Sequence, residues 1–433
     1  MKFRIIILYQ LLAFYLNRDH KKSNEKLKVL QEKRFKKLKR HLELSGFYSR
    51  MNIRNKELHE FPIINKEIFM KNFDTINTVG LKLTDANSLA ALAEERRDFS
   101  ETLNSITVGL STGTSGNKGV FLASERERAM WIAAILHRVI GLSFRKRTVA
   151  FFLRANSRLY ESSGSALLKF NYFDLLKPVG ESFQHLISLK ADILVAQPSV
   201  LLMLAKLYED NNIKPGFKKV ISIAEILEKQ DEIYLQEIFG LKIGEVYQAT
   251  EGFIGFRCSK GRIHLNTDFL IIEKDYVDRE SGRYNPVITD LYRRSQPVVR
   301  YRLDDILVDG DDCDCGISLP VIDRIEGRND DIIRLPDNRN MLVDIFPDYL
   351  RRAVALASDE IRYYTICQTG IKTLEVYFEC YNIANSDIVS SSILAGIENL
   401  LSKYNIKDCR VLFRASNIME TGVKLRRIRN EYN

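Results

Sequence analysis

The 433-residue chain contains little cysteine, little proline and no long apolar run. Six cysteines in a chain of this length form no obvious disulfide framework, which excludes the small disulfide-rich secreted domains and favours a reducing compartment. We therefore predict a cytoplasmic protein. Aromatic residues do not alternate with basic residues in the manner of RNA-binding strands, so we expect no nucleic-acid partner.

The apolar stretch at residues 5–16 follows Lys2 and Arg4. It is shorter than the about 20 residues that a membrane-spanning helix needs, and no small-residue cleavage site of a signal peptide follows it. We interpret it as a helix packed on the body of the protein. The alternative is a peripheral membrane anchor made by residues 1–40. Much of the formal charge of +9 lies at residues 21–40, which we interpret as a solvated helix face.

Hydrophobic content of 45% and charged content of 28% describe an ordinary globular protein, and 433 residues are too many for one compact core. Between residues 150 and 251, apolar strand-like runs alternate with helical patterns. This alternation predicts parallel βαβ units and a doubly wound α/β core. The predicted strands are 148–152, 192–195, 219–223 and 245–247, and the predicted helices are 199–208 and 229–239.

After Gly252 the pattern changes to successive strands, which predict a small β-barrel or a distorted sheet beside the α/β core. These runs are 254–257, 263–265, 269–273, 287–290 and 298–303. A smaller α+β region ends the chain, with strands at 373–379 and 410–413 and a helix at 386–403. We predict an N-terminal domain at 1–327, with a mostly helical lead-in at 1–100 and a β-rich subdomain at 253–327, and a C-terminal domain at 328–433.

Residues 110–119, with the sequence LSTGTSGNKG, combine glycines, hydroxyls and a lysine in one short segment. Glycines allow successive backbone N–H groups to face one anion, hydroxyls add donors, and Lys118 adds a positive charge. The composition suits phosphate binding, with a solvated turn as the alternative. Strand-like runs at 105–108 and 120–123 flank the segment, which predicts a hairpin connection and not the strand-to-helix loop of a Walker A motif.

Three further motifs follow in order, YQATEG from Tyr247, RYRLDD from Arg300 and GRNDDII from Gly327. Together with STGTSGNKG they resemble the motifs of the adenylate-forming superfamily. FLRANSRLYE from Phe152 and AQPS from Ala196 resemble the phenylacetate–CoA ligase branch and, within it, the proteins related to factor-390 synthetase. The phosphate loop of this chain lacks the family's proline and is one residue shorter.

The resemblance implies that the chain binds ATP and magnesium. Thr250 would lie near the α-phosphate, Glu251 would hold the magnesium, and Lys424 would enter the site during adenylation; these three are the implied catalytic residues. Magnesium prefers hard oxygen ligands such as a carboxylate. The implied ATP-binding residues are Ser111, Thr112, Gly113, Thr114, Ser115, Gly116, Lys118, Glu225, Tyr247, Asp305 and Arg328.

Asp305 is the implied ribose ligand, because one carboxylate can accept from both ribose hydroxyls. Asp330 matches the superfamily's hinge position, about which the C-terminal domain swings as a lid between two half-reactions. Phe152, Asn156 and Tyr160 lie between the phosphate loop and YQATEG, and their aromatic character favours an apolar or aromatic acid. Packing in the core explains Phe152 equally well.

Cys258, His264, Cys313 and Cys315 fall between the YQATEG and GRNDDII motifs, next to turn-like segments at strand ends. Three cysteines and one histidine suit a structural, tetrahedral zinc site. The pair at Cys258 and His264 is far along the chain from Cys313, so the site requires the sheet to bring both pairs together. Unrelated reduced cysteines are the alternative.

The sequence therefore predicts a ligase that forms an acyl-AMP from ATP and a small-molecule carboxylic acid, then a thioester with coenzyme A (CoA) or another thiol. One alternative is transfer of AMP to a hydroxyl, as the factor-390 synthetase resemblance implies. Another is a catalytically silent nucleotide-binding partner in polysaccharide assembly. A homodimer remains open.

Overall fold

The computed structural model describes residues 2–110, 119–141, 145–153, 168–414 and 426–432. The chain divides into two compact units. The first contains Met1–Leu303 and Val308–Arg324, and the second contains Asp304–Leu307 and Ile325–Asn433. Each unit has its own hydrophobic core. Among the described residues, no helix is both long enough and apolar enough to cross a membrane.

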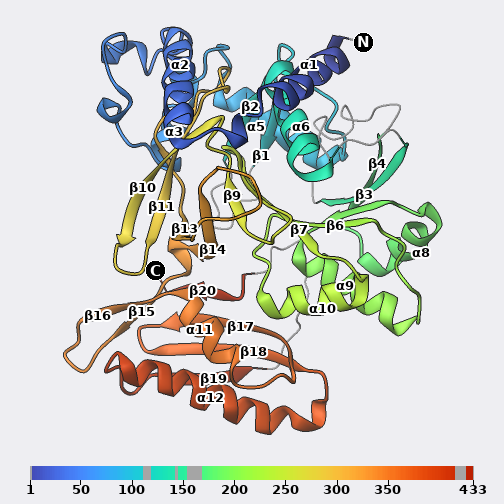
Figure 1. The fold of residues 1–433 in the computed structure, drawn as a ribbon. Helices are drawn as coiled ribbons and strands as arrows, with labels where there is room; N and C mark the ends of the chain where they lie inside the picture. Colours follow the sequence, from blue (N-terminus) through green and yellow to red (C-terminus); the bar gives the residue numbers. More distant parts are fainter. Residues whose placement is uncertain (1, 111–118, 142–144, 154–167, 415–425, 433) are drawn as a thin grey trace. The chain divides into compact units, whose positions relative to one another are not determined.

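Helices form most of the first hundred residues (Figure 1). In α2, Leu27, Phe35, Leu38 and Leu42 are buried at helical spacing, while most of the lysines are exposed. This apolar stripe explains why so basic a segment packs on the unit. The helices are α1 Lys2–Asn17, α2 Asn24–Leu42, α3 Lys66–Lys71, α4 Phe73–Ile76 and α5 Leu83–Arg96, with 3-10 turns η1 Asp19–Lys21, η2 Ser49–Met51 and η3 Leu58–Glu60.

Five parallel strands form the α/β core, in the order β4-β3-β5-β6-β7. They are β3 Arg147–Leu153, β4 Leu168–Asp174, β5 Ile193–Ala196, β6 Lys219–Ile223 and β7 Ile243–Ala249. The buried core lies between these strands and helices α8 Val179–Leu189, α9 Pro198–Asp210 and α10 Lys229–Phe239. The predicted parallel α/β core is confirmed. Strand β4 was not predicted, because its sequence LKFNYFD mixes polar and apolar residues.

The β-rich segment continues the same sheet in antiparallel fashion. Strand β8 Gly252–Arg257 pairs with β7 through a turn at Thr250 and Glu251. The whole sheet has twelve strands in the order β10-β11-β13-β14-β9-β8-β7-β6-β5-β3-β4, with β12 beside β11. The further strands are β9 Ile263–Leu265, β10 Leu270–Asp278, β11 Arg283–Asp290, β12 Tyr301–Arg302, β13 Asp305–Asp309 and β14 Val321–Arg328. Only two residues of the strand predicted at 298–303 pair as β12.

The predicted hairpin around the phosphate loop is confirmed, because β1 Thr107–Leu110 pairs antiparallel with β2 Val120–Ala123. Helix α6 Glu125–Ile135 follows, capped by the Ser124 side chain, and runs into a π-helical turn, η4 Leu136–Ile140. Helix α1 packs on α6 through an apolar cluster that includes Ile7 and Trp131 (Figure 1).

The second unit is an α+β fold, with a four-stranded sheet in the order β19-β18-β17-β20. Its core includes residues of α11 and α12, and the predicted helix at 386–403 matches α12. The elements are η5 Asn329–Asp331, β15 Ile333–Pro336, β16 Leu342–Ile345, α11 Pro347–Ala355, β17 Ile361–Gly370, β18 Thr373–Cys380, η6 Ile383–Asn385, α12 Ser386–Lys403, β19 Arg410–Arg414 and β20 Ile428–Asn430.

Candidate functional site

Several candidate residues lie at one edge of the sheet, where the parallel strands end. Glu225 follows β6, and Thr250 and Glu251 follow β7. Because these strands are parallel and adjacent, their carboxyl ends meet at the same edge. Open α/β sheets bind ligands in the crevice outside this edge. The first unit therefore brings these three side chains to the edge where a ligand is expected.

Glu225 is held in a fixed orientation at this edge. Ala224 has a φ of 67°, a left-handed conformation that is uncommon for alanine and turns the chain sharply after β6. The backbone N–H of Ser199, in the first turn of α9, donates to Glu225 Oε2 at 3.1 Å. A carboxylate at a helix N-terminus is favoured by the helix dipole. The AQPS segment and Glu225, distant in sequence, thus form one contact.

Thr250 and Glu251 form the two-residue turn between β7 and β8. The Thr250 hydroxyl donates to Glu251 Oε2 at 2.8 Å, and both residues are half-buried. Tyr247, two residues before the end of β7, is buried, with 7% of its surface exposed. The hydroxyl and the carboxylate therefore lie together at the strand edge, while Tyr247 is buried within β7.

A buried network fixes β2, the strand that follows the phosphate loop. Gln296 is fully buried; its Oε1 accepts from the Leu122 N–H at 2.9 Å, and its Nε2 donates to the Val120 carbonyl at 3.3 Å. Arg293 donates to Gln296 Oε1 at 2.9 Å and to the Thr250 carbonyl at 2.7 Å. The network thus joins β2 to the Thr250 turn. Residues Ser111, Thr112, Gly113, Thr114, Ser115, Gly116 and Lys118 lie outside the described residues.

Glu127 in α6 extends this network, because it binds the two residues that lie between Arg293 and Gln296. Its carboxylate accepts from the N–H groups of Ser295 at 2.8 Å and Ser124 at 2.6 Å, and from the N–H of Arg294 and the hydroxyl of Ser295. Burial acts to raise the pKa of Glu127, but these hydrogen bonds outweigh it, so the pKa lies below its usual value. Glu127 is therefore an ionised, buried anchor.

Sequence reasoning missed Arg293, Gln296 and Glu127. Each bonds segments about 40 to 170 residues apart in the chain, so no local motif marks them. One sequence signal was present, because a serine followed three residues later by a glutamate, as at Ser124 and Glu127, is the pattern of a helix capping box.

In the second unit, three charged residues lie close together. Arg328 Nε lies 3.9 Å from Asp305 Oδ1, and Arg328 Nη2 lies 3.4 Å from Asp304 Oδ2. Burial alone would lower the pKa of Arg328, but Asp305 and the other nearby carboxylates raise it, so the guanidinium stays charged. The sequence expectation that Asp305 and Arg328 serve one site is consistent with their proximity. Asp330 lies next to them in η5.

Asp331, which sequence reasoning passed over, is the buried anchor of this turn. Only 4% of its surface is exposed, and its carboxylate accepts from Arg426 Nε at 2.8 Å and from the Arg328 N–H at 3.2 Å. Arg426 comes two residues after Lys424, which lies outside the described residues. The GRNDD turn and Arg426 are therefore tied together within the second unit.

Phe152 lies in the core. It is 1% exposed and stacks on Phe173 with ring centroids 4.5 Å apart, within the cluster covered by the helices. This is the alternative that the sequence left open for Phe152. Asn156 and Tyr160 lie outside the described residues.

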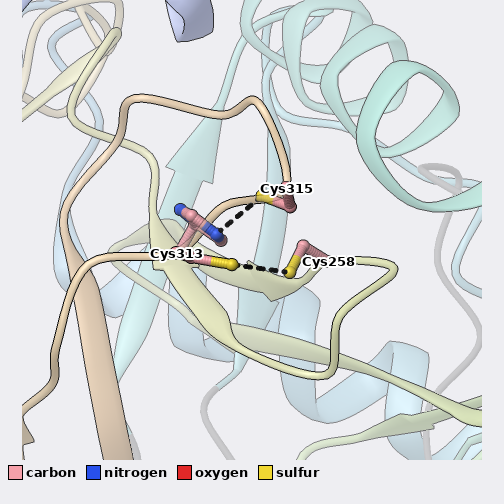
Figure 2. Close-up of side chains that lie close together, drawn as sticks. Cys258, Cys313 and Cys315 are labelled. Atoms are coloured by element: carbon pink, nitrogen blue, oxygen red, sulfur yellow. Dashed lines mark hydrogen bonds between the residues drawn. The ribbon is translucent and has the colours of Figure 1, made fainter.

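The four predicted metal ligands come together, because their ligand atoms all lie within 4.8 Å of one another. Figure 2 shows Cys258, Cys313 and Cys315 pointing toward one another. Cys258 Sγ is 3.8 Å from Cys313 Sγ, and Cys315 Sγ is 3.3 Å from His264 Nε2. Cys258 follows β8, His264 lies in β9, and the other two lie between β13 and β14.

Pairing of neighbouring strands creates this cluster. A Cβ at Gly255 would lie only 2.7 Å from the His264 carbonyl oxygen, so the close approach of β8 and β9 requires glycine there. On the other side of the ring from Nε2, His264 Nδ1 lies 2.9 Å from the Leu319 carbonyl oxygen. Donation from Nδ1 fixes the tautomer and leaves Nε2 free for a metal, the usual arrangement of a ligating histidine.

No family model matches the chain. The structure is similar to a solved 2-hydroxyisobutyryl-CoA ligase in the postadenylation state in complex with R3-HIB-AMP, with a TM-score of 0.70, 17% identity, and coverage of 96% of this chain and 92% of the other. It is also similar to the GH3.15 acyl acid amido synthetase, with a TM-score of 0.61, 14% identity, and coverage of 93% and 88%. The chain thus has the fold of the adenylate-forming enzymes.

One curated relative adds sequence similarity. The indoleacetate–lysine synthetase of Pseudomonas savastanoi is 30% identical over 127 residues. The match covers 28% of this chain and 31% of that protein, so the chain matches less than a third of its relative's length.

Proposed function

We propose that the chain catalyses ATP-dependent adenylation of a carboxylic acid to an acyl-AMP. One observation carries the proposal: Glu225 and the YQATEG residues Thr250 and Glu251 gather at the carboxyl edge of the parallel strands. The solved 2-hydroxyisobutyryl-CoA ligase with the same fold is in complex with R3-HIB-AMP, an acyl-AMP.

In this proposal a substrate carboxylate oxygen attacks the α-phosphorus of ATP, and the bond to the departing pyrophosphate breaks. Both reactants are anionic, so the site must supply positive charge and oriented donors. Residues 111–119, including Lys118, hold the β- and γ-phosphates. Thr250 donates to the α-phosphate, and Glu251 offers a hard oxygen ligand suited to magnesium. Tyr247 and Glu225 border the base.

The superfamily resemblance also assigns roles to residues of the second unit. Asp305 binds the ribose hydroxyls, and Arg328 binds the ribose or the phosphates. Asp330 acts as the hinge of the C-terminal lid, which comprises residues 328–433. Lys424 neutralises charge on the α-phosphoryl oxygens in the transition state.

For the acceptor we propose the thiol of CoA, which attacks the acyl carbon and releases AMP. The 2-hydroxyisobutyryl-CoA ligase has been solved with both an acyl-AMP and CoA. The motifs that resemble the phenylacetate–CoA ligase branch favour the same acceptor. An amine is the second candidate, because the indoleacetate–lysine synthetase and the amido synthetase are named for amide formation. The hydroxyl acceptor implied by the factor-390 synthetase resemblance is the third.

Pyrophosphate exchange tests the first half-reaction. Labelled pyrophosphate is incubated with the protein, ATP, magnesium and a panel of aromatic, aliphatic and hydroxylated acids. Label that enters ATP only when one class of acid is present is the expected result, and it names the substrate class. ATP binding without exchange for any acid would contradict the proposal and favour the silent nucleotide-binding partner.

The second half-reaction is tested with the acid identified by exchange. AMP release is compared with CoA, with a panel of amino acids and with neither, and the product is identified by mass. A thioester product supports CoA as the acceptor, whereas an amide product would contradict it and favour an amine.

We further propose that Cys258, His264, Cys313 and Cys315 bind a structural zinc ion. Tetrahedral zinc with bonds of about 2.3 Å to sulfur holds two sulfurs about 3.8 Å apart, and Cys258 Sγ and Cys313 Sγ are 3.8 Å apart. The chain supplies four ligands, which leaves no open position for a substrate and favours a structural ion.

Elemental analysis tests this proposal. About one zinc per chain is expected, and Cys313→Ser should lose most of it and lower the melting temperature. Cys409→Ser, outside the cluster, is the matched control and should retain the zinc. Equal zinc content in the two variants would overturn the assignment.

A further inference from the structure

The outer face of α1 is an exposed apolar stripe. Its members recur at helical spacing, with exposed fractions of 59% for Ile5, 56% for Leu8, 67% for Tyr9, 51% for Leu12 and 80% for Leu16. Between residues 5 and 16 the sequence has no charged residue. We call these five residues the α1 stripe.

The opposite face of α1 is already covered. Ile7 and Leu11 are buried, Phe3 packs in the cluster with α6, and Phe14 stacks on His137 with ring centroids 5.4 Å apart. A helix that is apolar on both faces is normally buried on both. Because α6 and η4 occupy one face, the α1 stripe is the apolar face of this helix that remains exposed to solvent.

The charge around the stripe indicates what covers it. The first 40 residues contain 13 lysines and arginines and 3 acidic residues, whereas the other 393 residues contain 52 basic and 53 acidic residues. All the excess positive charge of the chain therefore lies in and directly after α1. On α2, exposed Lys33, Lys36 and Lys37 line a surface hollow together with Arg40, Val29 and Glu32.

We propose that α1 and α2 bind the surface of an anionic lipid bilayer. The α1 stripe would enter the boundary between headgroups and acyl chains, with Tyr9 at the headgroup level, while the basic residues of α2 face the lipid phosphates. Helix α1 is too short to cross the bilayer, so it lies in the interface. In Figure 1 both helices lie at the same end of the first unit.

A second copy of the chain fits this surface less well. A symmetric dimer formed through the α1 stripe would bring two excesses of ten positive charges close together, and like charges across an interface are unfavourable. An anionic bilayer satisfies both the apolar and the basic features at once. It also explains why they are neighbours in the sequence.

Vesicle flotation with the full chain tests the proposal. The protein is expected to float with vesicles of phosphatidylcholine and phosphatidylglycerol, to float poorly with phosphatidylcholine alone, and to be released by high salt. Substitution of Ile5, Leu8 and Leu12 by serine should lower the apparent affinity by about tenfold or more, because their burial supplies the apolar part of the binding. The matched control replaces exposed Ile383 and Ile388 of the second unit by serine.

The basic residues are tested separately. Lys33, Lys36 and Lys37 are replaced by glutamine, with exposed Lys190, Lys214 and Lys407 replaced in the control. Loss of flotation with the first set and not with the second supports the proposal. If the triple serine variant does not fold, Leu16→Ser replaces it in the flotation experiment, because Leu16 is the most exposed residue of the stripe. Pyrophosphate exchange measured without lipid reports on the proposed adenylation alone. Failure of the membrane proposal can therefore be distinguished from failure of the proposed adenylation.

Two results would overturn the proposal. One is unchanged flotation of the serine variants. The other is failure of the wild type to float, combined with self-association in sedimentation that the serine substitutions abolish, which would assign the stripe to a second copy of the chain.

Discussion

At the scale of single residues, Gln296 has the largest predicted effect among the described residues of the first unit. Its amide satisfies two backbone groups of β2 and also accepts from Arg293. Gln296→Leu would leave these buried polar groups without that partner, at about 1–3 kcal/mol for each unsatisfied group. We expect the free energy of unfolding to fall by about 3 kcal/mol or more in urea titrations, and ATP affinity to fall with it.

Gln236→Leu is the matched control, because this glutamine makes one partly buried hydrogen bond on α10, away from β2. A loss of about 1 kcal/mol is expected there. Similar losses in the two variants would argue against a network centred on Gln296.

Asp330 and Asp331 allow a sharper comparison of neighbouring residues. Asp331→Asn removes the buried partner of Arg426, and breaking such a pair costs about 3–5 kcal/mol. We expect it to lower the melting temperature and the rate of adenylation together. Asp330→Asn should leave the melting temperature unchanged and alter the ratio of the two half-reaction rates. Equal effects of the two variants on melting would contradict this division of roles.

At the scale of elements, η1 carries the buried His20 and η4 the half-buried His137, and their rings lie 5.1 Å apart. Burial, with the positive charge of Arg138, lowers the pKa of His20 to about 3 and that of His137 to about 4. In the unfolded chain both would titrate at about 6.5. Below this pH the unfolded state binds more protons than the folded state, so acidification destabilises the fold.

Stability should therefore be full above pH 6.5 and fall toward pH 4, with a loss of about 2 kcal/mol for each histidine at pH 5. Urea titrations at several pH values measure this slope. His137→Gln should flatten it, whereas exposed His59→Gln should not. The buried carboxyl of Asp290, whose pKa is raised to about 6, stabilises the fold on acidification and so opposes the histidines. The difference in slope between the variant and the wild type therefore tests the prediction. If the slope of unfolding free energy against pH is the same in His137→Gln as in the wild type, the prediction is wrong.

The elements that the sequence predicted well are those whose pattern is local. Strand β5 is a continuous apolar run, β6 is mostly apolar, and α12 has regular helical spacing. The π-helical turn at η4 was not predictable, because its buried faces are set by α1 and β8, which are distant in sequence. In the candidate site, Thr250 and Glu251 were visible as a motif, whereas Gln296 became visible only through contacts with residues more than 170 positions away.

At the scale of the whole molecule, strand β8 connects the two features predicted in the first unit. It starts directly after Glu251, ends directly before Cys258, and pairs with β7 over most of its length and with β9 over its last three residues. An inserted residue would turn every following side chain to the opposite face of the sheet. Among homologues of this chain, the six residues of β8 should therefore be constant in number, with glycine kept at position 255.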